Sequence, residues 1–248
     1  MSVLVGKTAL VVGGSGGIGA ASAALFAQAG ARVIVTHRPG NAAAGEAVVA
    51  HLPGTGHAAL PVDVADTSTI LALRDSIAAR FGRLDILINT AGFTKPVSHA
   101  DLDALDDALI DRMFAVNWRG QFATIRAFAP LLKASGDGLI VSISSIAGAN
   151  GNGSSIAYCA VKAGIDVMTK SLARALAPEI RVLAVSPGVV ETGFVPGRGA
   201  EFNAKTAATT PLRRVATAND VAEAVLACAT HLRFSTGTII VVDGGRSL

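Results

Sequence analysis

Short runs of apolar, mostly β-branched residues alternate along the chain with longer alanine-rich stretches. Runs such as Ile86–Ile88 contain no polar position, which is typical of strands buried on both faces of a parallel sheet. Regular alternation of strand and helix predicts an α/β fold: a doubly wound, mostly parallel sheet of seven strands with helices on both faces. The expected strands are Thr8–Val12, Arg32–Thr36, Ala58–Val62, Leu84–Asn89, Leu139–Ser144, Arg181–Ser186 and Thr238–Val242. The expected helices are Ile18–Ala29, Ala42–His51, Thr67–Phe81, Leu102–Leu132, Ser155–Leu176 and Asn219–Ala229.

The segment Thr192–Arg214 differs from the rest because it mixes Gly, Pro, Thr and Phe without clear periodicity. No linker or repeat divides the chain, so we expect residues 1–248 to form one domain. A loop this long is either a functional lid or a flexible surface segment. The segment leaves the carboxyl edge of the expected sheet, where ligands of such folds bind, which favours a substrate lid at 192–214.

Composition narrows the class of protein. Of 248 residues, 51% are hydrophobic and 16% charged, and the formal net charge is +3, which excludes a disordered chain. Residues 8–31 and 139–161 carry no charge, but frequent glycines and serines interrupt them, so we expect no membrane span. Scattered basic residues and only 4% aromatics argue against nucleic acid as a partner. Cys159 and Cys228 fit neither a disulfide framework nor a metal site, which favours the cytoplasm.

A glycine-rich turn, Gly13–Gly19, stands between the first expected strand and the first expected helix. Glycines there permit a tight turn and expose backbone amides at the positive end of a helix, where phosphates bind. Flexible surface loops and methyltransferase cofactor sites look similar, but the position between strand and helix favours a dinucleotide. The residues expected to contact it are Gly13, Ser15, Gly17, Ile18 and Gly19.

The end of the second expected strand bears on cofactor choice. An acidic residue near this position usually binds the ribose 2′-hydroxyl of NAD, but the chain has His37 and Arg38 here. A guanidinium matches a 2′-phosphate, so Arg38, helped by His37, favours NADP(H) over NAD(H). The alternative is a solvated arginine at the start of a loop.

Two further strand ends contribute candidate cofactor contacts. Asp63, followed by Val64, ends the third strand and either accepts from the adenine amino group or caps the next helix. The fourth strand ends at Asn89, and the small residues Ala91 and Gly92 would let the cofactor lie close to the backbone.

Tyr158, the single tyrosine, stands four residues before Lys162. Positions i and i+4 of a helix share a face, so the two side chains would be neighbours. A nearby ammonium favours the phenolate, which would tune the phenol toward a proton donor at neutral pH. A core tyrosine beside a surface lysine is the alternative, but the glycine turn argues against it.

These motifs together resemble the short-chain dehydrogenase/reductase family, in its single-domain form of about 250 residues. The resemblance extends to Ser145 and Asn117, to the segment Ser186–Thr192 and to the closing Val241–Gly245. It implies a Rossmann-type fold and a catalytic group of Asn117, Ser145, Tyr158 and Lys162. The implied roles are acid/base for Tyr158 and ribose binding with pKa depression for Lys162. Ser145 would polarise the carbonyl, and Asn117 would hold a water. Contacts with the nicotinamide and pyrophosphate are implied for Pro187, Gly188, Val190 and Thr192.

The chain departs from the family pattern at Val12, where a threonine usually braces the turn, and at Leu183, where an asparagine is common. The expected substrate pocket is mostly apolar and lacks a cluster of basic residues, which favours a neutral ketone. Its candidate lining residues are Phe93, Ile146, Ala149, Asn150, Phe194, Val195 and Phe202.

Three functions stay open from the sequence: an NADPH-dependent carbonyl reductase, a 3-oxoacyl-carrier-protein reductase and a non-catalytic nucleotide sensor. Basic side chains that would dock an acidic carrier are few, with Lys133 and Arg119 as the candidates. The family resemblance also implies a homotetramer built through the alanine-rich faces of residues 115–129 and 155–177.

Overall fold

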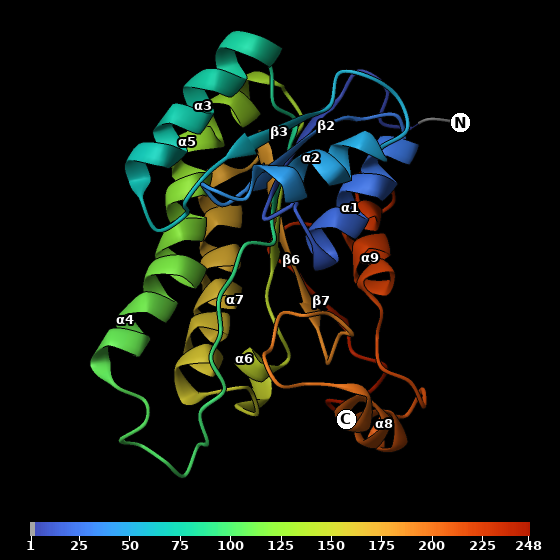
Figure 1. Cartoon of the computed structure of the whole chain (residues 1–248). Helices are drawn as coiled ribbons and strands as arrows, with labels where there is room; N and C mark the ends of the chain where they lie inside the picture. Colours follow the sequence, from blue (N-terminus) through green and yellow to red (C-terminus); the bar gives the residue numbers. More distant parts are fainter. Residues whose placement is uncertain (1–2) are drawn as a thin grey trace.

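A computed structural model describes residues 3–248 and confirms the doubly wound sheet (Figure 1). Within these residues the sheet has seven strands in the order β3-β2-β1-β4-β5-β6-β7, and every neighbouring pair is parallel. The strands are β1 (Thr8–Val12), β2 (Arg32–His37), β3 (Ala58–Pro61), β4 (Ile86–Asn89), β5 (Gly138–Ile143), β6 (Ile180–Pro187) and β7 (Ile239–Val242).

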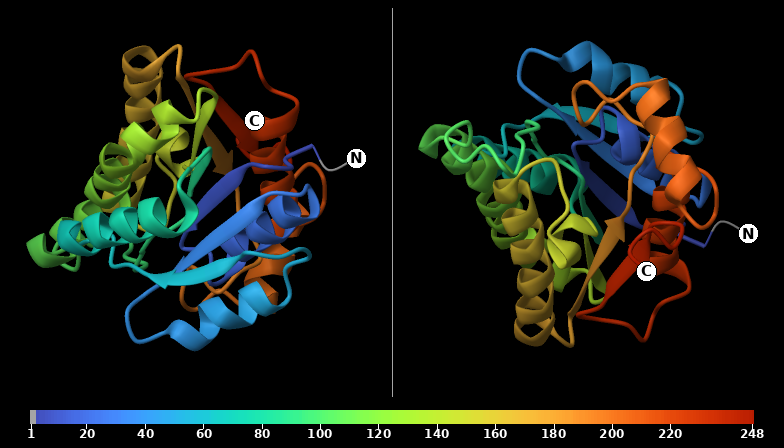
Figure 2. Two further views of the ribbon diagram at one scale, coloured as in Figure 1. Left: turned by 90° about the horizontal axis from the view of Figure 1, so that it is seen from above. Right: turned by 90° about the horizontal axis from the view of Figure 1, so that it is seen from below.

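Helices pack on both faces of the sheet, as Figure 2 shows from above and below. One apolar core lies between the sheet and α3, α5 and α7, and a second lies between the opposite face and α1, α2 and α9. The helices are α1 (Gly17–Gln28), α2 (Ala42–Ala50), α3 (Thr67–Phe81), α4 (Asp107–Phe114), α5 (Gly120–Ala134), α6 (Ala147–Asn150), α7 (Ile156–Leu176), α8 (Ala200–Thr209) and α9 (Ala218–Thr230). In the described part of the chain, no helix combines the length and apolarity that a membrane crossing requires.

The expected helix Leu102–Leu132 is wrong at its start and in its continuity. α4 begins only at Asp107, because the Asp106 carboxylate accepts from the Leu109 amide at 2.7 Å and so ends the preceding turns. A π-helical turn (η1, Ala115–Arg119) then separates α4 from α5. Such turns occur frequently at functional sites, and this one contains Asn117.

The expectation of an irregular segment at 192–214 is also wrong in part, because α8 lies within it. This helix and α6 lie at the carboxyl end of the sheet, the lower end in Figure 1. The sequence pattern did not reveal α8 because Phe202 is its one large apolar residue and Thr206 is its buried residue.

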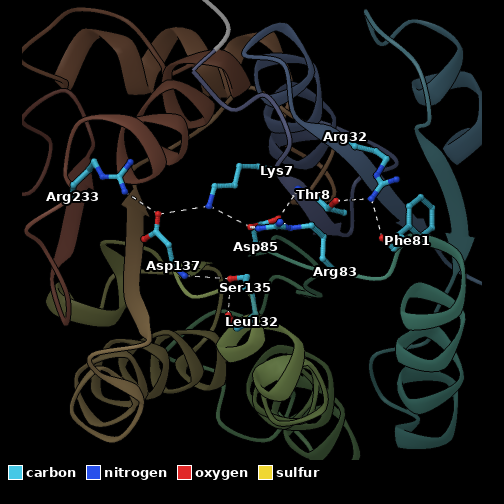
Figure 3. A network of polar contacts seen from close by, with 10 residues as sticks. All are labelled: Lys7, Thr8, Arg32, Phe81, Arg83, Asp85, Leu132, Ser135, Asp137 and Arg233. Carbon is cyan, nitrogen blue, oxygen red and sulfur yellow. Dashed lines mark hydrogen bonds and ion pairs between the residues drawn. The ribbon is translucent and has the colours of Figure 1, made fainter.

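A polar network closes the amino end of the sheet (Figure 3). The fully buried Asp85 carboxylate accepts from the Thr8 amide and from Arg83 Nε, both at 2.9 Å. Lys7 Nζ lies 3.3 Å from Asp85 and 3.7 Å from Asp137, which also accepts from Arg233 at 2.8 Å. Burial raises the pKa of Asp85, but the contacts with Arg83, Thr8 and Lys7 outweigh it and bring the pKa below its ordinary value.

Candidate active site

A cavity of about 1080 Å³ opens at the carboxyl ends of the strands, the usual ligand position in such sheets. All but two of the predicted site residues line it; the exceptions are Asn89 and Asn117, which are buried. The predicted residues at its wall are Gly13, Ser15, Gly17, Ile18, Gly19, His37, Arg38, Asp63, Val64, Ala91, Gly92, Ser145, Tyr158, Lys162, Pro187, Gly188, Val190 and Thr192.

The glycine turn has the shape of a phosphate cradle. A Cβ on Gly13 would stand 2.6 Å from the Ala91 nitrogen, and one on Gly19 would stand 2.3 Å from the Gly13 carbonyl oxygen. Gly17 has a φ of +52°, which disfavours larger residues. Helix α1 begins directly after Gly16 without a side-chain cap, so its first amides border the cavity. These features fit a dinucleotide phosphate.

Two threonines that the sequence reasoning missed brace this turn. Thr36 Oγ1 accepts from the Gly13 amide at 3.0 Å, and Thr90 Oγ1 donates to the Val12 carbonyl at 2.8 Å. They supply the hydroxyl bracing that Val12 cannot. Their positions could have indicated this role, because each threonine stands at or next to the carboxyl end of a strand adjacent to β1.

His37 and Arg38 differ in their freedom. The buried His37 ring contacts the Arg38 carbonyl through Nδ1 at 2.9 Å, and it packs so closely on α2 that a Cβ on Gly45 would stand 2.8 Å from it. The Arg38 side chain is exposed, and no hydrogen bond or ion pair within residues 3–248 occupies its guanidinium. Of the two, only Arg38 can turn freely toward a ligand.

Asp63 does not cap α3, so that interpretation is wrong. Its Oδ1 accepts from the Ala65 amide at 2.9 Å in the turn before the helix. The cap is Asp66, whose carboxylate accepts from the Ser68 amide at 2.8 Å. Asp63 keeps its place at the cavity wall, where a ligand contact stays a prediction.

Both predicted asparagines lie behind the wall. Both amide atoms of Asn89 are buried without a partner in the described chain, an unusual and costly state that often marks a functional site. Asn117 is fully engaged: its Nδ2 donates to the Phe93 and Met113 carbonyls at 2.8 and 2.9 Å, and its Oδ1 accepts from the Phe93 amide at 3.0 Å. Asn117 therefore clamps the loop after β4 onto the π-helical turn.

Ser145, Tyr158 and Lys162 line the same cavity. Helix α7 starts where the Ser155 hydroxyl accepts from the Tyr158 amide at 3.1 Å, which fixes Tyr158 in the first turn. Lys162 Nζ lies 5.5 Å from the Tyr158 ring centroid and donates to the Ile143 carbonyl at 2.8 Å. The i, i+4 geometry expected from the sequence is present.

The sequence predicts a lowered pKa for Tyr158, but in the structure this pKa is raised. Burial raises the pKa of Tyr158 to about 12, although the Ser145 hydroxyl and the charge of Arg198 act in the opposite direction. Burial also lowers the pKa of Lys162 to about 8, opposed by the charge of Asp166. Desolvation is therefore the largest influence on the pKa of both groups.

Asp166 is a third residue that the sequence reasoning missed. It follows Lys162 by four residues on α7, and its Oδ1 is buried without a partner among the described residues. Burial raises the pKa of Asp166, while the Ser144 hydroxyl and the charges of Lys162 and Lys170 lower it. The helical spacing from Lys162 was the signal that could have identified it.

The substrate end of the cavity combines aromatic and basic side chains. The ring centroids of Tyr158 and Phe194 lie 6.2 Å apart. The expected lining residues are confirmed except for Ala149; those at the wall are Phe93, Ile146, Asn150, Phe194, Val195 and Phe202. The sequence predicts a mostly apolar pocket without a cluster of basic residues, but Arg112, Arg198 and Arg246 also line the cavity. They are far apart in sequence, so no local pattern indicated that they line one cavity.

Comparison with known proteins places the chain in a family. A family model described as enoyl-(acyl carrier protein) reductase matches residues 13–247. The chain is 40% identical to cis-4-hydroxycyclohexanecarboxylate dehydrogenase of Sinomonas cyclohexanicum, over 96% of each chain. It is 33% identical to a 3-oxoacyl-[acyl-carrier-protein] reductase of Staphylococcus aureus, over 96% of this chain and 97% of the relative. The crystal structure of a Brucella melitensis short-chain dehydrogenase/reductase superposes with a TM-score of 0.90 at 30% identity, covering 98% of both chains.

The chain therefore belongs to the short-chain dehydrogenase/reductase family. It is an oxidoreductase of the class that interconverts C=O and CH–OH groups.

Proposed function

We propose that the chain catalyses the reversible, NADPH-dependent reduction of a ketone to a secondary alcohol. The observation that carries this proposal is the meeting of Ser145, Tyr158 and Lys162 in one cavity with the glycine turn. The residues that would hold the cofactor are those of the turn Gly13–Gly19, together with Arg38, Lys162 and the segment Pro187–Thr192. When bound, the nicotinamide supplies or accepts the hydride at the carbon of the substrate carbonyl.

The chain's own residues supply the proton that the carbonyl oxygen gains during reduction. A phenol with a pKa of about 12 is fully protonated at neutral pH, so the Tyr158 hydroxyl is ready to protonate the carbonyl oxygen as reduction proceeds. The Ser145 hydroxyl beside it would donate to the same oxygen and polarise the carbonyl. Lys162 would stabilise the resulting phenolate and bind the ribose hydroxyls. Phe194 would help to exclude water from this end of the cavity.

The decisive experiment replaces Tyr158 by Phe. Turnover of a ketone panel should fall by at least about a hundredfold, because general acid catalysis of this kind contributes about 10²–10⁴-fold. The dissociation constant of NADPH, followed by its fluorescence, should change less than threefold. A variant with wild-type turnover would refute the role of Tyr158. If the wild type binds NADPH as tightly as Tyr158→Phe does but turns over no carbonyl compound, the result would favour the sensor interpretation.

Arg38 supports NADP(H) over NAD(H) because its free guanidinium lies at the cavity wall and no acidic residue takes its place. Arg38→Ala should raise the KM for NADPH at least tenfold and leave the KM for NADH nearly unchanged. Arg174→Ala, which removes an exposed arginine on α7, is the matched control. A wild-type preference for NADH would overturn the assignment.

The segment 192–214 would act as the substrate lid, since it brings Phe194, Val195, Arg198 and Phe202 to the cavity. Free small ketones are the favoured substrates over carrier-linked ones. Arg119, one of the few candidates to dock a carrier, donates instead to the Ala65 carbonyl at 2.8 Å. Comparing kcat/KM for a free ketone and its carrier thioester tests this choice.

We also propose that the chain acts as a cytoplasmic homotetramer. Helix α7 leaves Val167 63% exposed, and Val241 on the edge strand β7 is 54% exposed, so both elements offer apolar surface to another copy. Sedimentation velocity at micromolar concentration should give a mass four times that of the chain, and Val167→Lys should lower it. A monomer at all concentrations would contradict the assembly.

A further inference from the structure

Three arginines line the substrate end of the cavity without a counter-ion. Arg112 comes from α4, Arg198 from the segment before α8, and Arg246 from the last turn of the chain. The ion pairs formed within residues 3–248 include none of them. Arg112 is exposed and keeps its hydration, whereas Arg198 is partly buried and has no hydrogen bond or ion pair within residues 3–248. A cation that has lost hydration without gaining a partner is costly, so the position beside Arg198 suits an anion.

Arg198 is the arginine that lies toward the reacting group. Its guanidinium carbon lies 4.6 Å from the centroid of the Phe202 ring, and the neighbouring Phe194 ring packs beside Tyr158. Burial lowers the pKa of Arg198, and the charge interaction with Tyr158 raises it. Arg198 and Tyr158 thus line the same part of the cavity, and an anion held by Arg198 would lie near the reacting carbonyl.

Arg246 adds a second positive charge behind Arg198. Its Nη1 donates to Thr209 Oγ1 at 3.0 Å and to the Thr206 carbonyl and Thr210 Oγ1, both at 3.4 Å. These contacts fix the guanidinium at the carboxyl-terminal end of α8, a favourable place for a cation. The like charge of Arg246 also acts on Arg198, so an anion between them would relieve a repulsion.

We propose that the substrate is a ketone or secondary alcohol that carries a carboxylate a few bonds from the reacting carbon, and that Arg198 binds this carboxylate. The inference rests on the proposed function and replaces the neutral ketone expected from the sequence. A guanidinium binds a carboxylate through two parallel hydrogen bonds. The aromatic rings of Phe93, Phe194 and Phe202 would enclose the hydrocarbon between the two groups.

The test compares matched acids and esters in the presence of saturating NADPH. The probes are 4-oxopentanoate and 3-oxocyclohexanecarboxylate, each with its methyl ester, which keeps the shape and removes the charge. The wild type should show a kcat/KM at least tenfold higher for the acids. Arg198→Gln should lower kcat/KM at least thirtyfold for the acids and less than threefold for the esters. Equal use of acid and ester by the wild type, or an equal loss for both in the variant, would overturn the inference.

Lys205→Gln is the matched control, because it removes one positive charge from the same segment at a side chain that is exposed and pairs with Glu201. It should leave both kcat/KM values unchanged. The NADPH dissociation constant of Arg198→Gln should also stay within threefold of wild type. A loss of NADPH affinity as large as the loss in kcat/KM would assign Arg198 to the cofactor and overturn the inference.

Calorimetric binding of cyclohexanecarboxylate, which has no ketone, separates this inference from the proposed function. The wild type should bind it, Arg198→Gln should bind it at least tenfold more weakly, and neither should bind cyclohexanecarboxamide. If no carbonyl compound is turned over, the proposed function fails while this binding still decides the role of Arg198. Absence of carboxylate binding by the wild type overturns the inference.

Discussion

Asp85 should be a main determinant of stability, and Asp85→Asn tests this with little change in side-chain shape. The substitution removes a fully buried charge that accepts from the Thr8 amide and from Arg83 and lies 3.3 Å from Lys7. Removing one partner of a buried pair costs about 3–5 kcal/mol. Because Lys7 and Arg83 are partly exposed and can regain hydration, we expect the lower end, about 3 kcal/mol.

Urea unfolding followed by circular dichroism, at one fixed protein concentration, measures this change in the free energy of unfolding. A loss of about 3 kcal/mol corresponds to a fall in Tm of roughly 6–12 °C for a chain of this length. Asp137→Asn is the control, because its carboxylate is partly exposed and should contribute less than about 1 kcal/mol. If Asp85→Asn lies within about 0.5 kcal/mol of wild type, the network does not stabilise the fold as argued.

The pH dependence gives a second measure of the same carboxylate. The folded pKa of Asp85 lies below the unfolded value of about 3.9, so its contribution is complete above that value. The contribution is lost as the pH falls through the folded pKa. Wild type should therefore lose stability in acid more steeply than Asp85→Asn, and parallel curves would contradict the assignment.

Three further substitutions test the site. Asp166→Asn removes the charge that raises the pKa of Lys162, so the alkaline fall of kcat should move to lower pH, and an unchanged pH profile would contradict this. Gly19→Ala should lower Tm by several degrees because the added Cβ has no room. Gly16→Ala is the control and should leave Tm unchanged, because a Cβ there would have no atom within 4 Å. Equal Tm values for the two variants would refute the steric reasoning. Thr90→Val should weaken NADPH binding about fivefold, the value of one hydrogen bond, with unchanged binding as the opposing result in a fluorescence titration.

The long periodic segments and the catalytic spacing were predictable because they depend on local sequence. Tyr158 and Lys162 share a helix face because they are four residues apart, and unbroken apolar runs indicate the strands. The missed features depend on contacts between distant segments. Arg198 and Arg246 meet only through the fold, and the π-helical turn at Asn117 arises from bonds to a loop 24 residues earlier. The periodicity of apolar residues predicts neither the proximity of these arginines nor the π-helical turn.

The anchoring of α8 by Arg246 has a practical consequence for work with this chain. The last turn of the described residues forms part of the cavity wall through Arg246, and Figure 1 shows the C-terminus beside α8. Leu4 lies away from the cavity, where its amide donates to Ala29 at the end of α1. A purification tag or fluorescent fusion should therefore be attached before Leu4, because the same addition after Leu248 would crowd the loops that line the cavity.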